Sequence, residues 1–104
     1  MGFFDLFKSS GPSSEKLKEI VNDSAFLVDV RSPGEFSSGS VKGAKNIPLD
    51  KINARLKDFK GKSNIVVFCR SGNRSGQAKS ILEKNGISNV TNGGTWMQVN
   101  KLLN

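Results

Sequence analysis

The chain has 104 residues, a formal net charge of +7, and apolar and charged fractions of 36% and 24% that are ordinary for one globular domain with a modest core. It contains no histidine and a single cysteine, Cys69. These absences exclude nucleophile pairs with a histidine base, zinc sites built on imidazole or clustered thiolates, and an internal disulfide. A chain without disulfides suits a reducing compartment. We expect a cytoplasmic protein without a metal or a cofactor.

The N-terminal segment MGFFDLFK is apolar, but neither it nor any other run reaches the about 20 apolar residues of a membrane helix. It has no basic start and carries Asp5, so it lacks the pattern of a secretory signal. We interpret residues 1–12 as a flexible arm and residues 13–104 as a single, monomeric domain. The alternative is that apolar side chains of the arm contact a partner or a membrane: Phe3, Phe4, Leu6 and Phe7.

Basic residues outnumber acidic residues by 16 to 9. A solvated surface that keeps the protein soluble and attracts small anions over a distance explains this excess. Nucleic-acid binding is not expected, because no binding motif occurs and aromatic residues do not alternate with the basic ones.

In chain order, the first elements expected are a helix, a strand and a short helix. The helix begins at Ser13 or Ser14, either of which can cap it, and has apolar residues at helical spacing. Residues 25–30, AFLVDV, form an apolar run that is typical of a strand buried on both faces. Ser32 and Glu35 have the spacing of a capping box, which predicts a short helix there.

The middle of the chain predicts an extended segment, a helix and a second buried strand. Residues 41–48, VKGAKNIP, are typical of a short strand or an extended connector. Asp50 is expected to cap an amphipathic helix that Gly61 stops. Residues 64–68, NIVVF, give the clearest strand pattern of the chain.

The last part of the chain predicts a helix, a strand and an amphipathic tail. The helix begins near Ser75 and ends before Gly86. Residues 87–92, ISNVTN, form a short strand, and Gly93 and Gly94 follow it as a turn before the tail.

Strands that alternate with amphipathic helices indicate an α/β domain whose central, mostly parallel sheet of four or five strands has helices on both faces. Ligands of such sheets bind where the strands end. Three of the strands end in residues that are therefore expected to converge: Asp29, Val30 and Arg31; Cys69 and Arg70; Asn92, Gly93 and Gly94.

Cys69 ends the clearest strand and is followed by a loop that leads into a helix. Such a loop can direct several backbone N–H groups at one point, and Gly72 and Asn73 tolerate the tight backbone that this needs. Reactive cysteines in such places have pKa values of roughly 3.5–7.5, compared with about 8.5 for a free thiol, so no histidine base is required. We interpret Cys69 as a nucleophile; the alternative is a buried, inert thiol.

Four motifs follow one another in a particular order. Asp29 and Arg31 end a strand ahead of a Glu-Phe pair, the turn GAKNIP follows at residues 43–48, and the cysteine loop and a Gly-Gly pair come after it. In this order the motifs resemble a single-domain rhodanese, a thiosulfate-type sulfurtransferase, over residues 17–96. The resemblance implies the rhodanese-like three-layer fold.

The resemblance also implies a relay through a persulfide on Cys69. The thiolate attacks the outer sulfur of a small anionic donor such as thiosulfate, and cyanide or a thiol, on a small molecule or a partner protein, then removes that sulfur. Arg70 and Arg74 would hold the donor, and Ser75 would hydrogen-bond to the sulfur. The substrate-binding loop then consists of Arg70, Ser71, Gly72, Asn73, Arg74 and Ser75.

Residues outside the loop are expected to support it. Asp29 and Arg31 are interpreted as a polar network that stabilises the fold. Gly93 and Gly94 are interpreted as allowing the backbone to approach the loop closely. Ser40 departs from the resemblance, because many rhodaneses carry a histidine there, and we interpret it as structural.

Two other functions stay open. A cysteine phosphatase or arsenate reductase uses a similar loop, but four residues separate Cys69 from Arg74, one fewer than in the phosphatases, and the loop offers no general acid. A non-catalytic sulfur carrier, or a module that binds a partner enzyme, fits the same motifs.

Overall fold

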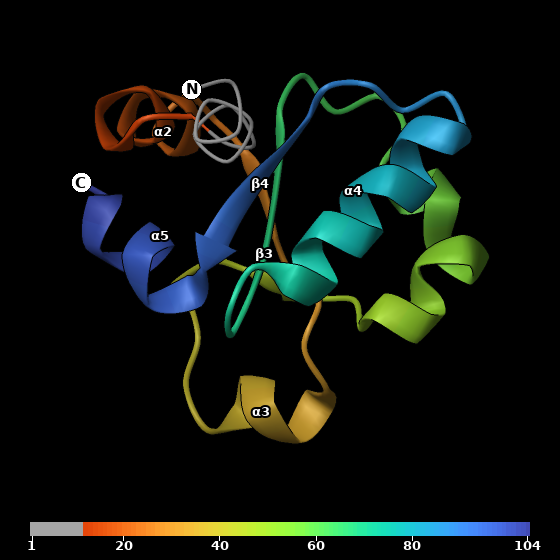
Figure 1. The fold of residues 1–104 in the computed structure, drawn as a ribbon, viewed down its shortest axis with the longest axis horizontal. Coiled ribbons are helices and arrows are strands. Elements are labelled where there is room, and N and C mark those ends of the chain that lie inside the picture. Colours follow the sequence, from red (N-terminus) through yellow and green to blue (C-terminus); the bar gives the residue numbers. More distant parts are fainter. Residues whose placement is uncertain (1–11) are drawn as a thin grey trace, which may run out of the picture.

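The computed structural model describes residues 12–104, so the arm expected at the N-terminus lies, up to residue 11, outside the described residues. Parallel strands form one sheet in the order β2-β1-β3-β4, of which β3 and β4 are labelled in Figure 1. They are β1 (Phe26–Asp29), β2 (Lys45–Asn46), β3 (Ile65–Cys69) and β4 (Val90–Thr95). Between residues 12 and 104, no helix is long and apolar enough to span a bilayer.

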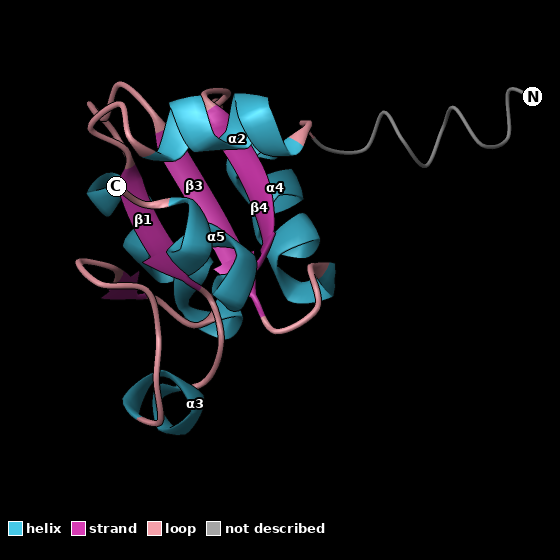
Figure 2. Cartoon of the chain, turned by 90° about the vertical axis from the view of Figure 1, so that its left-hand side faces the viewer, coloured by secondary structure: helices cyan, strands magenta, loops and turns pink. Residues whose placement is uncertain are grey.

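Helices cover both faces of this sheet. α2 (Ser14–Val21) and α5 (Trp96–Leu102) lie together on one face, and η1 (Leu49–Asp58) and α4 (Asn73–Lys84) lie on the other. α3 (Pro33–Ser37) stands apart, beyond the carboxyl ends of the strands (Figure 2). The predicted α/β fold, with a parallel sheet between two layers of helices, is therefore confirmed.

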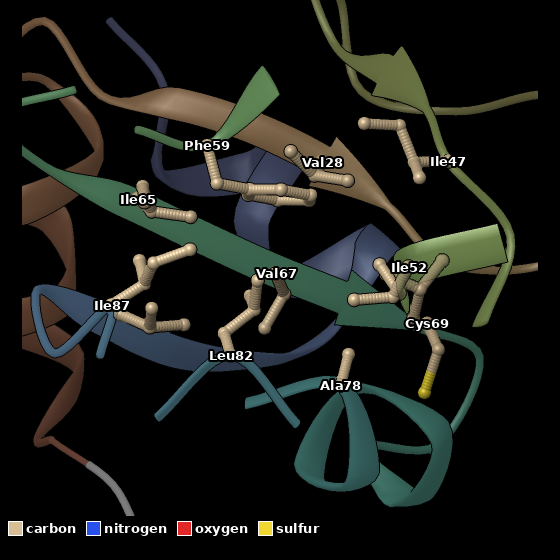
Figure 3. Packing of buried hydrophobic residues seen from close by; sticks show 12 residues of the cluster. Val28, Ile47, Ile52, Phe59, Ile65, Val67, Cys69, Ala78, Leu82 and Ile87 are labelled. Carbon is tan, nitrogen blue, oxygen red and sulfur yellow. The ribbon is translucent and has the colours of Figure 1, made fainter. Parts of the chain in front are cut away.

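The central strand β3 separates two apolar cores, because successive side chains of a strand point to opposite faces. Val66 and Phe68 pack into the core beneath α2 and α5. On the opposite face Cys69 belongs to the second core (Figure 3), which includes Val28, Ile47, Ile52, Phe59, Ile65, Val67, Ala78, Leu82 and Ile87. Cys69 thus continues a row of core side chains to the end of the strand, close to the start of α4.

Two predicted helix starts are confirmed by their caps. The Ser13 side chain accepts a hydrogen bond from Lys16 N–H at 3.2 Å and caps α2. Ser32 and Glu35 form the predicted capping box at the start of α3. Each cap joins residues within one helical turn, so the sequence spacing alone indicates it.

The predicted cap at Asp50 is wrong. Pro48 is the N-cap residue of η1, and its carbonyl accepts a hydrogen bond from Lys51 N–H at 2.8 Å. The segment is a 3-10 helix that bends at Arg55, where φ is −120° and ψ is 24°. Because its hydrogen bonds start at Pro48, Asp50 lies inside the helix. The helix ends before Gly61, as predicted, and φ at Gly61 is +80°.

The helix after the cysteine loop begins earlier than predicted. α4 starts at Asn73, two positions before Ser75, because Gly72 takes the N-cap position with φ of +96°. The loop between Cys69 and the helix is therefore shorter than expected, and the helix N-terminus lies closer to the sulfur along the chain.

Gly93 and Gly94 lie inside β4 and do not follow it as a turn. Val67 of β3 pairs with Asn92, whereas the next residue of β3 pairs with Gly94. Gly93 is therefore the extra residue of a bulge. The bulge is the reason that the strand continues through a Gly-Gly pair, which the sequence alone suggests as a turn.

Candidate active site

The predicted site residues gather at one edge of the sheet. β1, β3 and β4 are neighbours in the parallel sheet, so their carboxyl ends lie side by side. Asp29 is the last residue of β1, Cys69 the last of β3, and Gly93 and Gly94 lie near the end of β4. The three strand ends that were expected to converge do so.

Backbone N–H groups of the loop point at the sulfur of Cys69. The Sγ atom accepts a hydrogen bond from Gly72 N–H at 3.0 Å and one from Ser75 N–H at 3.4 Å, and Ser75 Oγ lies 3.4 Å away. Cys69 is 0% exposed. The sulfur is therefore shielded from solvent in this structure.

Opposing influences set the pKa of the Cys69 thiol. Burial raises the pKa and is the largest single influence, because it disfavours a charged sulfur. The Ser75 hydroxyl, which can donate to the sulfur once it is a thiolate, and the N–H groups of Ser75, Ser71 and Gly72 lower it, and together they outweigh burial. The pKa of Cys69 therefore lies below its ordinary value, which increases the fraction of thiolate at a given pH.

Gly72 makes this loop conformation possible. Its φ of +96° lies in the left-handed region that favours glycine. A Cβ at this position would lie 3.5 Å from Gly94 Cα, so the loop also packs closely against β4. α4 begins at the next residue, Asn73, and the positive end of its dipole adds to the groups that favour an anion near Cys69. The side chains of Asn73 and Ser71 are exposed.

Arg74 is bound to Glu35 of α3. Its Nη1 and Nη2 atoms donate to the two carboxylate oxygens at 2.8 and 3.0 Å. The hydrogen bond from Arg74, followed by that from Ser32 N–H, lowers the pKa of Glu35 to about 2. The same pairing, above all the hydrogen bond to Glu35, raises the pKa of Arg74. The pair fastens α3 to the start of α4.

Arg70 has different surroundings. It lies at the other end of the loop, is exposed, and makes no ion pair within residues 12–104. Of the two arginines expected to hold an anionic donor, Arg70 is therefore the one whose guanidinium is available to a ligand.

Asp29 and Arg31 form a buried ion pair behind the site. The residues are 0% and 4% exposed, and Arg31 Nη2 lies 2.6 Å from Asp29 Oδ2. The same Nη2 donates to the Gly39 carbonyl at 2.6 Å, and Ser40 Oγ donates to Asp29 Oδ2 at 2.6 Å. Arg31 also lies under the Trp96 ring, 5.0 Å from its centre. Ser40 thus completes a polar network and makes no hydrogen bond to the sulfur of Cys69.

Two surface hollows flank the loop. One, of about 380 Å³, is lined by Arg70 together with Arg31, Glu35, Trp96 and the exposed Met97. The other, of about 490 Å³, has Arg74 in its wall. Within residues 12–104, no three metal-ligating side chains of the His, Cys, Asp or Glu type lie close enough together to hold an ion.

The sequence pattern placed Asn92 at a strand end but gave it no role in the site. Its side chain hydrogen-bonds to Ser75 Oγ and to the Gly72 carbonyl, the two loop residues whose N–H groups reach the sulfur. Its position ahead of a Gly-Gly pair at a strand end is the only signal in the sequence, and it suggests a location without a role.

Comparison with known proteins shows the family of the chain. Residues 13–95 match the model of the rhodanese-like domain. The chain belongs to the rhodanese-like domain family. It is 36% identical to a solved structure described as rhodanese with anions from E. coli, with a TM-score of 0.65 and coverage of 71% of this chain and 89% of the other.

Curated relatives of the chain include one that is named for an activity and one that is not. Thiosulfate sulfurtransferase PspE of Escherichia coli is 39% identical over 69 residues, which are 64% of this chain and 66% of that protein. Uncharacterized protein YqhL of Bacillus subtilis is 38% identical over 68 residues, 65% of this chain and 54% of that protein. The chain thus spans about half to two thirds of the length of these two relatives.

Proposed function

We propose that this rhodanese is a sulfurtransferase that carries sulfane sulfur as a persulfide on Cys69, from a small anionic donor such as thiosulfate to cyanide or a thiol. The observation that carries the proposal is the pair of backbone N–H groups, from Gly72 and Ser75, directed at Sγ. These donors stabilise an anionic sulfur in a site that has no general base. Relatives that are named sulfurtransferases support the same activity.

The first half of the reaction forms the persulfide. The Cys69 thiolate attacks the outer sulfur of thiosulfate, a new S–S bond forms, and the S–S bond of the donor breaks. Sulfite leaves with the bonding electron pair, and the negative charge of the enzyme moves from Sγ to the outer sulfur of the persulfide. Arg70 is the exposed cation nearest in sequence to Cys69 and suits the binding of the donor anion.

The second half returns the thiolate. Cyanide or a thiolate attacks the outer sulfur, and the Cys69 thiolate leaves with the electrons of the S–S bond. Because Cys69 is the only cysteine of the chain, no second thiol of the same chain can attack the persulfide, form a disulfide with Cys69 and release the outer sulfur as hydrosulfide. The acceptor must therefore come from outside this chain, as a small molecule or on a partner protein.

Intact-mass spectrometry tests the proposal. After incubation with thiosulfate, the chain is expected to gain the mass of one sulfur atom, and cyanide should remove it. Cys69→Ser is the control and should gain nothing while keeping its fold by circular dichroism. A mass increase that persists in Cys69→Ser would show that another group carries the sulfur, and no increase in the native chain would exclude thiosulfate as a donor.

The burial of Cys69 favours a second candidate, a sulfur carrier that exchanges sulfur with one partner protein. A sulfur that is 0% exposed can react slowly with free thiosulfate and quickly when a partner displaces the loop. Slow steady-state thiocyanate formation, combined with fast loading of Cys69 from a persulfidated protein, would support the carrier. Fast turnover of thiosulfate alone would favour the enzyme.

A further inference from the structure

Asn92 bridges β4 and the cysteine loop at two places. Its Nδ2 donates to the Gly72 carbonyl at 3.2 Å, and its Oδ1 accepts from Ser75 Oγ at 2.7 Å. Gly94 N–H donates to the same Oδ1 at 2.9 Å. Asn92 therefore holds the two residues that donate to Cys69 Sγ, although it makes no hydrogen bond to the sulfur.

The neighbours of Asn92 determine the orientation of its amide. Gly94 N–H can only donate and the Gly72 carbonyl, which also accepts from Gly76 N–H, can only accept, so the oxygen must face Gly94 and the nitrogen Gly72. Since a carbonyl oxygen cannot donate, the bond from Ser75 to Oδ1 uses the only proton of the hydroxyl. Ser75 Oγ then presents a lone pair to Sγ, 3.4 Å away.

We propose that Asn92 is a positioning residue that competes with Cys69 Sγ for the single hydroxyl proton of Ser75. While the sulfur is a thiol, its S–H can donate to Ser75 Oγ, and the hydroxyl donates to Asn92. When the sulfur is a thiolate it accepts only, so the hydroxyl must turn from Asn92 to Sγ. Asn92 thereby favours the thiol, in opposition to the backbone N–H groups of the loop.

The inference deepens the proposed function and rests on it for its catalytic meaning. A sulfur that is partly protonated at rest is oxidised less readily, because susceptibility to oxidation increases with the fraction of thiolate. After attack on a donor the charge lies on the outer sulfur of the persulfide, so the Ser75 hydroxyl is free to return to Asn92. The hydroxyl thus follows the charge on Sγ through the cycle.

Titration of the thiolate by its ultraviolet absorbance tests the competition, and the signal is clean because the chain has one cysteine and no tyrosine. Asn92→Ala frees the Ser75 hydroxyl and is expected to lower the midpoint of Cys69 by about half a pH unit to one unit, the effect of one hydrogen bond of ordinary net strength. Asn64→Ala is the matched control. It removes a half-buried amide that donates to the Ile20 carbonyl at 2.8 Å beside the amino end of β3, and should leave the midpoint unchanged.

Ser75→Ala completes a double-mutant cycle. In the native chain it should move the midpoint by less than about half a unit, and in the Asn92→Ala background it should raise the midpoint by about one unit. Equal shifts in both backgrounds, or an unchanged or raised midpoint in Asn92→Ala, would overturn the proposal.

Should Asn92→Ala fail to fold, Ser75→Ala alone decides. A rise of about one unit or more in the native chain would mean that the hydroxyl already donates to the sulfur, against the proposal, and a smaller shift would support it. No sulfur donor enters these titrations. Their result is therefore independent of whether the chain transfers sulfur.

Discussion

Arg70 and Arg74 stand at opposite ends of the cysteine loop, and the sequence gives no reason to distinguish them. Their surroundings differ at the scale of single residues. Both terminal nitrogens of Arg74 are engaged by Glu35, whereas Arg70 is exposed and unpaired within residues 12–104. An anion that approaches the loop therefore meets a free guanidinium only at Arg70.

We expect Arg70→Ala to raise KM for thiosulfate about 3- to 10-fold, the loss of roughly one charge-assisted contact. A neutral donor should be affected less, and added salt should reduce the difference from the native chain. Arg55→Ala is the matched control, because it removes the same charge from an exposed side chain that pairs with Asp58 at 2.6 Å. Steady-state kinetics at two ionic strengths measure both. Equal effects of the two variants would assign the binding to net charge and not to Arg70.

α3 illustrates how an element without a core of its own is held in place. None of its residues is buried, and its own hydrogen bonds are those of the capping box and of a single helical turn. The ion pair of Glu35 with Arg74 links it to α4. The position of α3 over the strand ends thus depends on a charge that acid removes.

The free energy of unfolding should report this link through its pH dependence. The hydrogen bond from Arg74, followed by that from Ser32 N–H, lowers the pKa of Glu35 from 4.5 to about 2. The pair therefore stabilises the fold fully above about pH 4.5, and its contribution is lost as the pH falls toward 2. Glu35→Gln should be less stable than the native chain at neutral pH, with a smaller decline in acid. Because the pair is partly exposed, the effect should be small and weaker in salt.

Urea unfolding at a series of pH values measures this difference. Glu19→Gln is the matched control, since Glu19 forms an exposed pair with Lys16 at 3.7 Å. If the curves of the native chain and Glu35→Gln run parallel through the acid range, the pair does not contribute to stability.

The whole molecule depends on close packing between β3, β4 and α5. At the bulge, a Cβ added to Gly93 would lie 2.8 Å from Val99 Cγ2 and 2.9 Å from Val66 Cγ1. Both valines are 0% exposed in the core beneath α2 and α5. Since packed cores have little room to relax, the added methyl group must displace these valine side chains or the elements that carry them.

Gly93→Ala should therefore reduce the free energy of unfolding by about 1–3 kcal/mol, the usual effect of overpacking a core. Gly34→Ala is the control, because nothing lies within 4 Å of the Cβ that it would add. Chemical unfolding at neutral pH compares the two variants. A Gly93→Ala protein as stable as Gly34→Ala would show that the bulge is looser than the contacts indicate.

Local patterns in the sequence indicated most of the elements and the loop after Cys69. Each of these patterns involves only a few neighbouring residues: the caps at Ser13 and Ser32, the alternation in β3, and the loop after Cys69. Capping and strand alternation act over one turn or one pleat. They can therefore be recognised in the sequence without knowledge of the fold. Asp50 is one of the exceptions, because Pro48 starts a tighter helix that the apolar spacing does not distinguish from an α-helix.

Only the tertiary structure decided which distant side chains meet at the sulfur. Glu35 and Arg74 are 39 positions apart, and Ser75 and Asn92 are 17 apart. Their contacts depend on where α3 comes to lie and on the register of β4 against β3, which the bulge at Gly93 shifts by one residue. Register follows from packing across the whole sheet, and so no local pattern encodes it.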